Sequence, residues 1–281
     1  MNNILTKLFF GTAFTLTLLA SCSPKDKTQI DVCELKSDTI VYIDNTSKSS
    51  PSCTLEFNYK YLKTRDTKDT TVQKINDIIQ SFISDNKVMH CDAKLFLPTL
   101  SDRYISSYIN DVRDLYLADV KNRVDIEEIP SWYDYQFNIK TDIDMGKNGY
   151  WNYRVEEFQY TGGAHPNTFS RMININSANG NTLTKENLFK KGTEKDVCGV
   201  IMKYLINLVN ERLDSETVTD IEGLHEIGLL LDTDLFIPDN FIYGKNHFIF
   251  YYNRYEIGPY AVGDFEIEVP YYELKAYLNI E

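Results

Sequence analysis

Two long segments in which apolar and polar residues alternate dominate the middle of the chain. They read WYDYQFNIKTDIDM (Trp132–Met145) and YWNYRVEEFQYT (Tyr150–Thr161), and only GKNG separates them. Alternation with period two places one set of side chains on each face of a strand, and a short glycine-containing connection joins two strands as a hairpin. The sequence therefore predicts a long antiparallel hairpin with one buried face, which other elements must cover.

Further segments extend this hairpin into an α+β fold. Apolar residues recur every three or four positions in the predicted helices and alternate in the predicted strands. Helices are expected at Thr70–Asp85, Ser101–Asn122 with Ser101 as N-cap, near Thr184, at Glu194–Asp214 and at Tyr271–Asn279. Strands are expected at Asp38–Asp44, Cys53–Leu62, Thr168–Asn176 and Asp264–Pro270, with a second hairpin across Leu235–Ile257. We predict an antiparallel sheet of long hairpins with helices packed on one face, in an N-terminal half (residues 31–165) and a C-terminal half (residues 166–281).

The N-terminus has the pattern of a secreted, lipid-anchored protein. Lys7 precedes LFFGTAFTLTLLA (Leu8–Ala20), an apolar run too short to span a bilayer comfortably and typical of a signal peptide. LASC, ending at Cys22, resembles a bacterial lipobox, in which two acyl chains on the cysteine anchor the protein stably. We predict a signal peptide at residues 1–21, a lipid-anchored tether at residues 22–30, and membrane contact through Cys22 alone. The tether lacks a dense acidic run, which favours the periplasmic side of the envelope.

The cysteines other than Cys22 are even in number, in a compartment that oxidises thiols. Cys33 and Cys53 flank a predicted strand and a Ser/Pro-rich turn, so a disulfide between them would close an N-terminal hairpin. Cys91 and Cys198 form a second pair only by elimination, and free buried thiols are the alternative. No C-x-x-C spacing occurs, which disfavours a thiol-redox or zinc site.

Composition narrows the classes of partner. Hydrophobic residues make up 43% of the chain, as in globular proteins, and the net charge is −12. An acidic surface repels nucleic acid and anionic lipid and attracts cationic partners, although solubility alone also explains acidity. The 20 tyrosines suit protein or glycan interfaces, and they suit half-buried sheet faces equally.

The segment YTGGAHPNTF, between two predicted strands, is the first candidate site. Gly162 and Gly163 permit positive φ, and Pro166 keeps His165 extended, so the motif predicts a tight turn in which the His165 ring bonds to backbone. A ligand-contacting loop that includes Asn167 is the alternative. No nucleophile motif or zinc spacing accompanies the 4 histidines, so we predict no catalytic residue, metal or cofactor.

The segment YEIGPYAVG (Tyr255–Gly263) is the second candidate site. Its glycines and proline predict irregular backbone between two strands. On a loop carried by a rigid sheet, Tyr255 and Tyr260 would reach a protein or glycan ligand. The alternative is that they are buried and hold the loop through their hydroxyl groups.

The order of these motifs resembles one family. Gly162, Gly163, His165 and Pro166 match its first block, and its second block is matched by Tyr255, Glu256, Gly258, Pro259, Tyr260, Gly263, Pro270, Tyr271 and Leu274. The pattern is similar to the extracytoplasmic domain shared by the lysozyme-sensing anti-sigma factor RsiV and the non-catalytic region of the peptidoglycan deacetylase PdaC. Gly258 departs from it, because alanine is expected there. The resemblance covers nearly all of the predicted mature chain and implies an RsiV/PdaC-like fold, without an anti-sigma segment or a deacetylase domain.

Three hypotheses of function follow. The first is an envelope-anchored, non-enzymatic binding module that captures lysozyme or another cationic protein, which the resemblance implies and the acidic charge favours. The second is a lipoprotein that binds peptidoglycan or another glycan. The third is an unrecognised cell-wall hydrolase, which the motifs disfavour. None of the three involves nucleic acid.

Overall fold

The computed structural model describes residues 29–44, 50–66, 68–85, 91–122 and 130–280. The predicted signal peptide (residues 1–21), Cys22 and the tether up to residue 28 lie outside the described residues. Across the described ranges, no helix has both the length and the apolar character needed to cross a bilayer.

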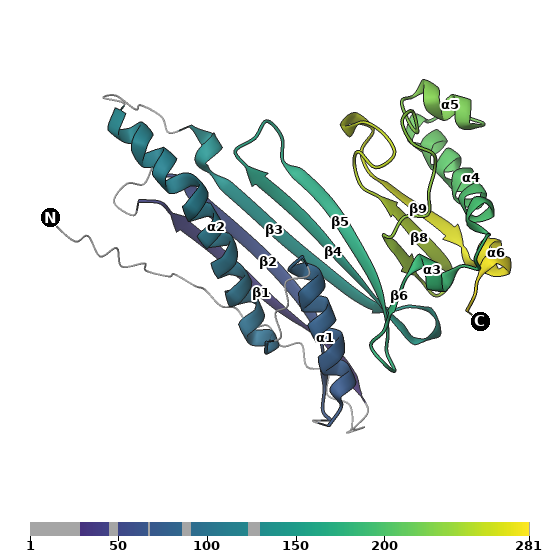
Figure 1. The fold of residues 1–281 in the computed structure, drawn as a ribbon, viewed down its shortest axis with the longest axis horizontal. Helices are drawn as coiled ribbons and strands as arrows, with labels where there is room; N and C mark the ends of the chain where they lie inside the picture. The colour runs from purple at the N-terminus through teal and green to yellow at the C-terminus, as the bar shows by residue number, and fades with distance from the viewer. Residues whose placement is uncertain (1–28, 45–49, 67, 86–90, 123–129, 281) are drawn as a thin grey trace.

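A six-stranded sheet forms the larger part of the fold (Figure 1). Neighbouring strands are antiparallel, except that β2 and β3 are parallel and are connected through two helices. The predicted hairpin is confirmed as β3 and β4, with Met145 opposite Trp151 next to the turn. In spatial order the strands are β1 (Ile30–Tyr42), β2 (Ser52–Thr64), β3 (Tyr135–Met145), β4 (Tyr150–Thr161), β5 (Asn167–Asn176) and β6 (Thr182–Leu183).

Helices α1 (Thr70–Ile83) and α2 (Ala93–Asn122) lie across one face of this sheet (Figure 1). The predicted apolar stripe of α1 packs there, with Ile75 and Ile79 fully buried against the sheet. Each fully buried aliphatic side chain of this kind contributes about 1.5–3 kcal/mol. The α+β class, with helices on one face of a sheet of long hairpins, is therefore confirmed, and the opposite face of the sheet is left open.

Helix α2 begins earlier than the sequence predicts. Ser101 is not its N-cap but a buried residue inside the helix. The Asp92 carboxylate instead accepts the N–H of Lys94 at 2.8 Å. Proline lacks an N–H and disfavours a helix interior, yet Pro98 lies inside this helix. The helix continues through it because its neighbours are buried in the core: Phe96, Leu97 and Leu100.

The C-terminal unit has its own antiparallel sheet, made of β7 (Phe241–Tyr243), β8 (His247–Tyr252) and β9 (Phe265–Pro270). The predicted second hairpin is confirmed over β7 and β8 only, because residues 235–240 and 253–257 are not strands. The buried stripe of α4 includes Val197, Ile201 and Leu205 and belongs to the core of this unit. The helices of the unit are α3 (Lys185–Leu188), α4 (Glu194–Leu213), α5 (Ile221–Glu226) and α6 (Tyr271–Leu274).

The division between the two hydrophobic cores falls after β5. The first core extends from Leu35 to Ile175 and the second from Leu183 to Leu278. The predicted boundary between residues 165 and 166 separates β4 from β5, yet these strands are paired along their lengths. Strand β5 thus belongs to the N-terminal unit, and the structure divides later along the chain than predicted.

Side-chain amides of the C-terminal unit bond to the edge of β5. The Ser170 N–H donates to Asn253 Oδ1 at 2.7 Å, and Asn253 Nδ2 donates to the Ser170 carbonyl at 3.0 Å. Asn240 also donates to the Ser170 carbonyl, at 3.1 Å, and accepts the Met172 N–H at 3.2 Å. These amides satisfy backbone groups that a further strand would otherwise pair with.

A third amide completes the junction from the opposite side. Asn174 of β5 donates to the Phe241 carbonyl and accepts the Tyr243 N–H, both at 2.8 Å. Beside it, Met172, Ile242 and Tyr251 form a small buried apolar cluster between the sheets. The two sheets are therefore held in a defined relative position.

The structure does not contain the predicted disulfides. Cys33, Cys53, Cys91 and Cys198 are all free thiols. In the β1–β2 register Cys33 lies opposite Tyr61, whereas Cys53 lies opposite Val41. That offset is about 26 Å at ~3.3 Å per residue, while a disulfide needs Cα atoms within about 7 Å. The second pair is excluded because Cys91 packs against the first core and Cys198 against the second.

Candidate functional site

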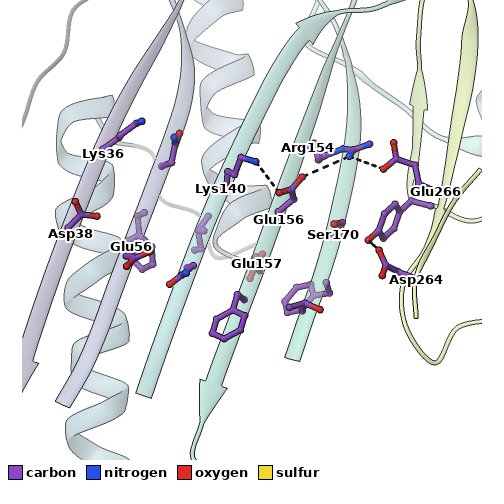
Figure 2. Close-up of a pocket in the computed structure, with 18 residues that line it drawn as sticks. Lys36, Asp38, Glu56, Lys140, Arg154, Glu156, Glu157, Ser170, Asp264 and Glu266 are labelled. Carbon is purple, nitrogen blue, oxygen red and sulfur yellow. Dashed lines mark hydrogen bonds and ion pairs between the residues drawn. The ribbon is translucent and has the colours of Figure 1, made fainter. Parts of the chain in front are cut away.

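The open face of the large sheet forms one wall of a polar groove of about 640 Å³. Successive side chains of a strand point to opposite faces. Arg154 and Glu156 of β4 therefore line the groove (Figure 2), whereas Val155 between them is buried in the core on the helix side. The other wall comes from the C-terminal unit, where Glu266 of β9 and the preceding Asp264 face the sheet (Figure 2).

Arg154 connects the two walls of this groove. Its Nη1 lies 2.9 Å from Glu266 Oε2 across the groove and 3.9 Å from Glu156 Oε1 on its own strand (Figure 2). Lys140 Nζ approaches the second oxygen of Glu156 at 3.5 Å. Partly exposed ion pairs contribute only about 0–1 kcal/mol each. Their main effect here is to fix where the charges of the groove stand.

Carboxylates outnumber cations among the charged side chains of the groove. Asp38 of β1 stands directly opposite Glu56 of β2, and both side chains are exposed. The nearby Lys36 pairs instead with Glu34, at 3.7 Å. Like charges directly opposite each other destabilise a sheet. The acidic members are Asp38, Glu56, Glu156, Asp264 and Glu266, against the basic Lys36, Lys140 and Arg154.

Two neighbouring groups do not add to this open negative charge. Burial and the hydrogen bond to Asp264 raise the pKa of Tyr251 to about 12, so its hydroxyl stays protonated and donates to that carboxylate. Glu157 pairs with Arg171 on the helix side of β4, and burial raises its pKa. Glu156 and Glu157 therefore point to opposite faces and form no carboxylate pair for acid–base work on one bond.

An aromatic cluster joins the two loops that the sequence singled out. The rings of His165 and Tyr260 stack with centroids 5.7 Å apart and planes at 21°. Tyr255 lies 5.8 Å from Tyr260, and the Arg254 guanidinium lies 4.6 Å from the centre of the same ring. Tyr255 is 71% exposed. The cluster thus centres on Tyr260 and presents Tyr255 to solvent.

The backbone around this cluster is specialised. Gly162 has φ +79°, and a Cβ there would collide with the backbone of Trp132, so only glycine fits. Tyr255 has φ 69°, which costs a residue with a side chain about 1 kcal/mol. Its turn is held by Asn253, whose N–H donates to Glu256 Oε2 at 2.8 Å and whose carbonyl accepts the Glu256 N–H at 3.1 Å. Strained residues that a structure holds in place are frequent at binding sites.

The aromatic cluster stands at one end of the polar groove. Strand β5 starts at Asn167, just after the His165 turn, and its next residues line the groove. Asp264 in the groove wall follows directly on the loop that carries Tyr260. Figure 1 shows the β4–β5 and β8–β9 connections reaching toward the same end of the molecule.

The structure therefore brings His165 together with Tyr255 and Tyr260, which come much later in the sequence. The His165 ring does not bond to backbone as predicted: within the described chain it is exposed and stacks on Tyr260. Positive φ occurs at Gly162 and not at Gly163. Pro166 and Asn167 lead into β5 and make no aromatic contact in the described cluster. Sequence reasoning missed Arg254 and the groove charges, although strand alternation is a signal for the latter.

No group of three or more His, Cys, Asp or Glu side chains is placed to hold a metal among the described residues. The described histidines lie on separate elements. His165 is in the β4–β5 turn, His225 is in α5, and His247 of β8 lies with its Nδ1 3.2 Å from Glu268.

Comparisons with known proteins agree with the fold. Residues 186–272 match the family model described as protein of unknown function, DUF3298. A crystal structure of a DUF3298 family member from Bacteroides fragilis is similar with a TM-score of 0.78 and 22% identity, over 91% of this chain and 96% of that one. A DUF3298 family protein from Pseudomonas aeruginosa gives a TM-score of 0.55 and 12% identity, over 90% and 96%. No curated protein matches the chain. At these identities the likeness concerns the fold.

Proposed function

We propose that this chain is an envelope-anchored, non-enzymatic binding module that captures a cationic protein such as lysozyme. The polar groove would receive basic side chains of the partner, and the aromatic cluster at its end would anchor one apolar contact. The resemblance of the two motif blocks to the RsiV and PdaC extracytoplasmic domains supports this proposal. The lipid anchor at Cys22 and the periplasmic location belong to the same proposal.

The observation that carries the proposal is the Asp38–Glu56 pair. These carboxylates face each other across two strands, and the described residues offer neither of them a salt-bridge partner. A fold gains nothing from such a pair, because like charges directly opposite are destabilising. A cationic side chain bound between them would remove the repulsion. The pair is therefore better explained by a ligand than by the stability of the free protein.

The aromatic cluster supplies the second kind of contact that such an interface needs. Charge complementarity mainly accelerates association, whereas buried aromatic and arginine side chains hold the complex together. Tyr255, Tyr260 and Arg254 are of these types, and their mutual contacts order them before binding. A preordered contact loses less conformational entropy when the complex forms.

The test is calorimetry of the soluble Cys22→Ala protein with hen-type lysozyme at low and at physiological salt. The proposal expects a complex whose association slows as salt rises, because screening acts over ~8 Å at physiological ionic strength. The complex should inhibit lysozyme only by covering its active site, and mass spectrometry should show that the lysozyme chain is not cleaved. A folded protein that gives no heat and no complex at low salt would remove the cationic-protein proposal.

Glycan binding is the second candidate function, favoured by the exposed ring of Tyr255 beside Tyr260. An exposed ring with a polar hydroxyl suits the apolar face of a sugar. Cosedimentation with insoluble peptidoglycan distinguishes the two candidates. Binding that survives high salt and is lost in Tyr255→Ala favours the glycan, whereas binding that needs the groove carboxylates favours the protein.

The anchoring part of the proposal has its own test. Lipid chains on Cys22, rather than the folded domain, would hold the protein at the membrane. The Cys22→Ala protein should therefore appear folded in the soluble fraction after signal cleavage. Cleaved but still membrane-bound protein would contradict this anchoring.

A further inference from the structure

A second groove, of about 1040 Å³, lies in the C-terminal unit between α4 and residues 234–237. Its floor includes Phe189 and Ile237, which are almost fully buried. Its walls are largely apolar and come from Met202 of α4, Ile221 at the start of α5 and Phe236, which is 38% exposed. None of its lining residues also lines the polar groove. The two sites are therefore separate.

A glycine keeps the α4 wall of this groove open. Gly199 lies inside α4, where glycine costs about 1 kcal/mol relative to alanine. No atom lies within 4 Å of the place that a Cβ at Gly199 would occupy. Packing therefore does not require glycine here. The missing side chain instead leaves room beside Cys198 and Met202, which line the same wall.

Lysine side chains stand at the rim of the apolar walls, in a chain whose net charge is −12. Lys185 is engaged, because its Nζ donates to the Ile237 carbonyl at 3.0 Å and lies 3.1 Å from Asp239. Lys191 and Lys195 are exposed and form no salt bridge within the described part of the chain.

Two of the three acidic residues that line this groove are held by backbone groups, and the third, Asp234, is exposed. The Glu194 carboxylate accepts the Gly192 N–H at 3.2 Å, and hydrogen bonds to the amides of Glu194 and Gly192 lower its pKa. A hydrogen bond to its own amide likewise lowers the pKa of Glu186. Glu186 and Glu194 are thus engaged locally although they keep their charge, and Lys191 and Lys195 are the rim cations that form no salt bridge among the described residues.

We propose that this groove binds a fatty acid, a single long acyl chain with a terminal carboxylate. The chain would lie along the apolar walls, and the carboxylate would pair with Lys191 and Lys195. The volume lies at the upper end of the range of small-molecule sites, and methionine adapts readily to a flexible chain. An extended peptide fits less well, because its backbone N–H and C=O groups would find few partners among apolar walls. This site does not depend on the function proposed for the polar groove.

The experiment is a titration of the Cys22→Ala protein, purified without detergent, with the fluorescent fatty acid cis-parinaric acid. Saturable one-to-one binding that palmitate displaces is expected. Gly199→Leu places a side chain in the groove and favours the helix, so the protein should fold and bind at least about tenfold more weakly. The matched control is Gly199→Ala, which should melt at a higher temperature and bind within about twofold of the parent.

The head-group assignment is tested by Lys191→Gln combined with Lys195→Gln. This variant should weaken palmitate binding at low salt and leave the binding of the uncharged hexadecanol unchanged. The site can also be tested without a substitution, by measuring the rates at which Cys198 and Cys33 are alkylated. Palmitate should slow the alkylation of Cys198 and leave that of Cys33 unchanged. Absence of saturable binding, equal binding by Gly199→Leu and Gly199→Ala, or capture of apolar peptides but not palmitate would overturn the proposal.

Discussion

Replacing Glu56 by glutamine should stabilise the free protein and at the same time weaken its complex with a cationic partner. Glu56 faces Asp38 across the β1–β2 pair, where no described cation forms a salt bridge with either carboxylate. Most substitutions that harm binding either leave stability unchanged or lower it. Opposite signs for stability and affinity are therefore a specific signature of a pair retained for a ligand.

The size of the expected stability change follows from the register of β1 and β2. Directly opposed side chains on antiparallel strands stand about 5.5 Å apart, so two unit charges in water repel by about 0.8 kcal/mol. Screening at physiological salt lowers this to about 0.4 kcal/mol. The expected rise in Tm is about 1–3 °C, larger at low salt than at high salt. Asp38→Asn should give a rise of the same size, and the double variant should gain little beyond either single one.

Binding is measured on the same samples by calorimetry with lysozyme at low salt. Loss of one groove carboxylate should weaken the complex by about two- to tenfold, mainly through slower association. The matched control is Glu226→Gln, which removes the same charge from an exposed position on α5 that does not line the groove. It should change affinity by less than about twofold.

Two results would refute this reasoning. If Glu56→Gln lowers the melting temperature, the carboxylate contributes to the fold and the like-charge argument fails. If Glu56→Gln and Glu226→Gln weaken lysozyme binding equally, the net charge attracts the partner and the groove is not the contact surface. Both measurements are made on variants that remain folded, so neither result can be attributed to unfolding.

The remaining predictions concern the aromatic cluster and its loops. Gly162→Ala should lower the melting temperature markedly, because its φ is +79° and its Cβ would meet the backbone of Trp132; a Tm within a degree of the parent would contradict the fit of this turn. Tyr260→Ala should cost about 1–3 kcal/mol of lysozyme affinity, because the complex dissociates faster without the ring. Surface plasmon resonance measures the dissociation rate, and an unchanged rate would show that the ring lies outside the contact. Burial raises the pKa of Glu256 above its ordinary 4.5, so its charged form destabilises the fold as pH rises. Glu256→Gln keeps an acceptor for the Asn253 N–H. Its free energy of unfolding should therefore equal that of the parent below pH 4.5 and exceed it above that pH. A difference in the free energy of unfolding that is the same at every pH, measured by chemical denaturation, would contradict this.

The sequence was sufficient to predict the helices and strands whose apolar residues recur with a strong period. The hairpin of β3 and β4 follows from alternation, and the buried stripe of α1 follows from the spacing of its isoleucines. It failed where tertiary packing overrides a local signal. Ser101 resembles a helix N-cap, yet the burial of the preceding apolar residues extends α2 by more than a turn. The predicted Cys33–Cys53 disulfide failed because strand register, and not proximity in the chain, decides which residues meet.

The candidate site was predictable only in its parts. Both loops were identifiable from glycine, proline and exposed aromatic residues, but nothing in the pattern states that His165 stacks on Tyr260. The groove charges are visible in the alternation of β4, whereas the partner of Arg154 on β9 depends on how the two sheets are placed. Contacts between units that are far apart in sequence leave no periodic signal.

That placement rests on the amide side chains at the junction, which hold the two sheets in a defined register. An apolar interface tolerates small shifts, because dispersion and burial change gradually with position. Asn240 and Asn253 instead form hydrogen bonds with Ser170. These bonds depend on distance and angle, so they would break if one sheet moved by one residue along the other. Asn253 also starts the turn that strains Tyr255, but it does so through its backbone N–H and C=O, which bond to Glu256. One residue therefore holds the second wall of the groove through its side chain and the exposed ring at its end through its backbone. Losing this side-chain amide should therefore weaken the junction while the backbone bonds of the turn remain, and Asn253→Asp, which keeps the side-chain acceptor but not the donor, tests the junction alone.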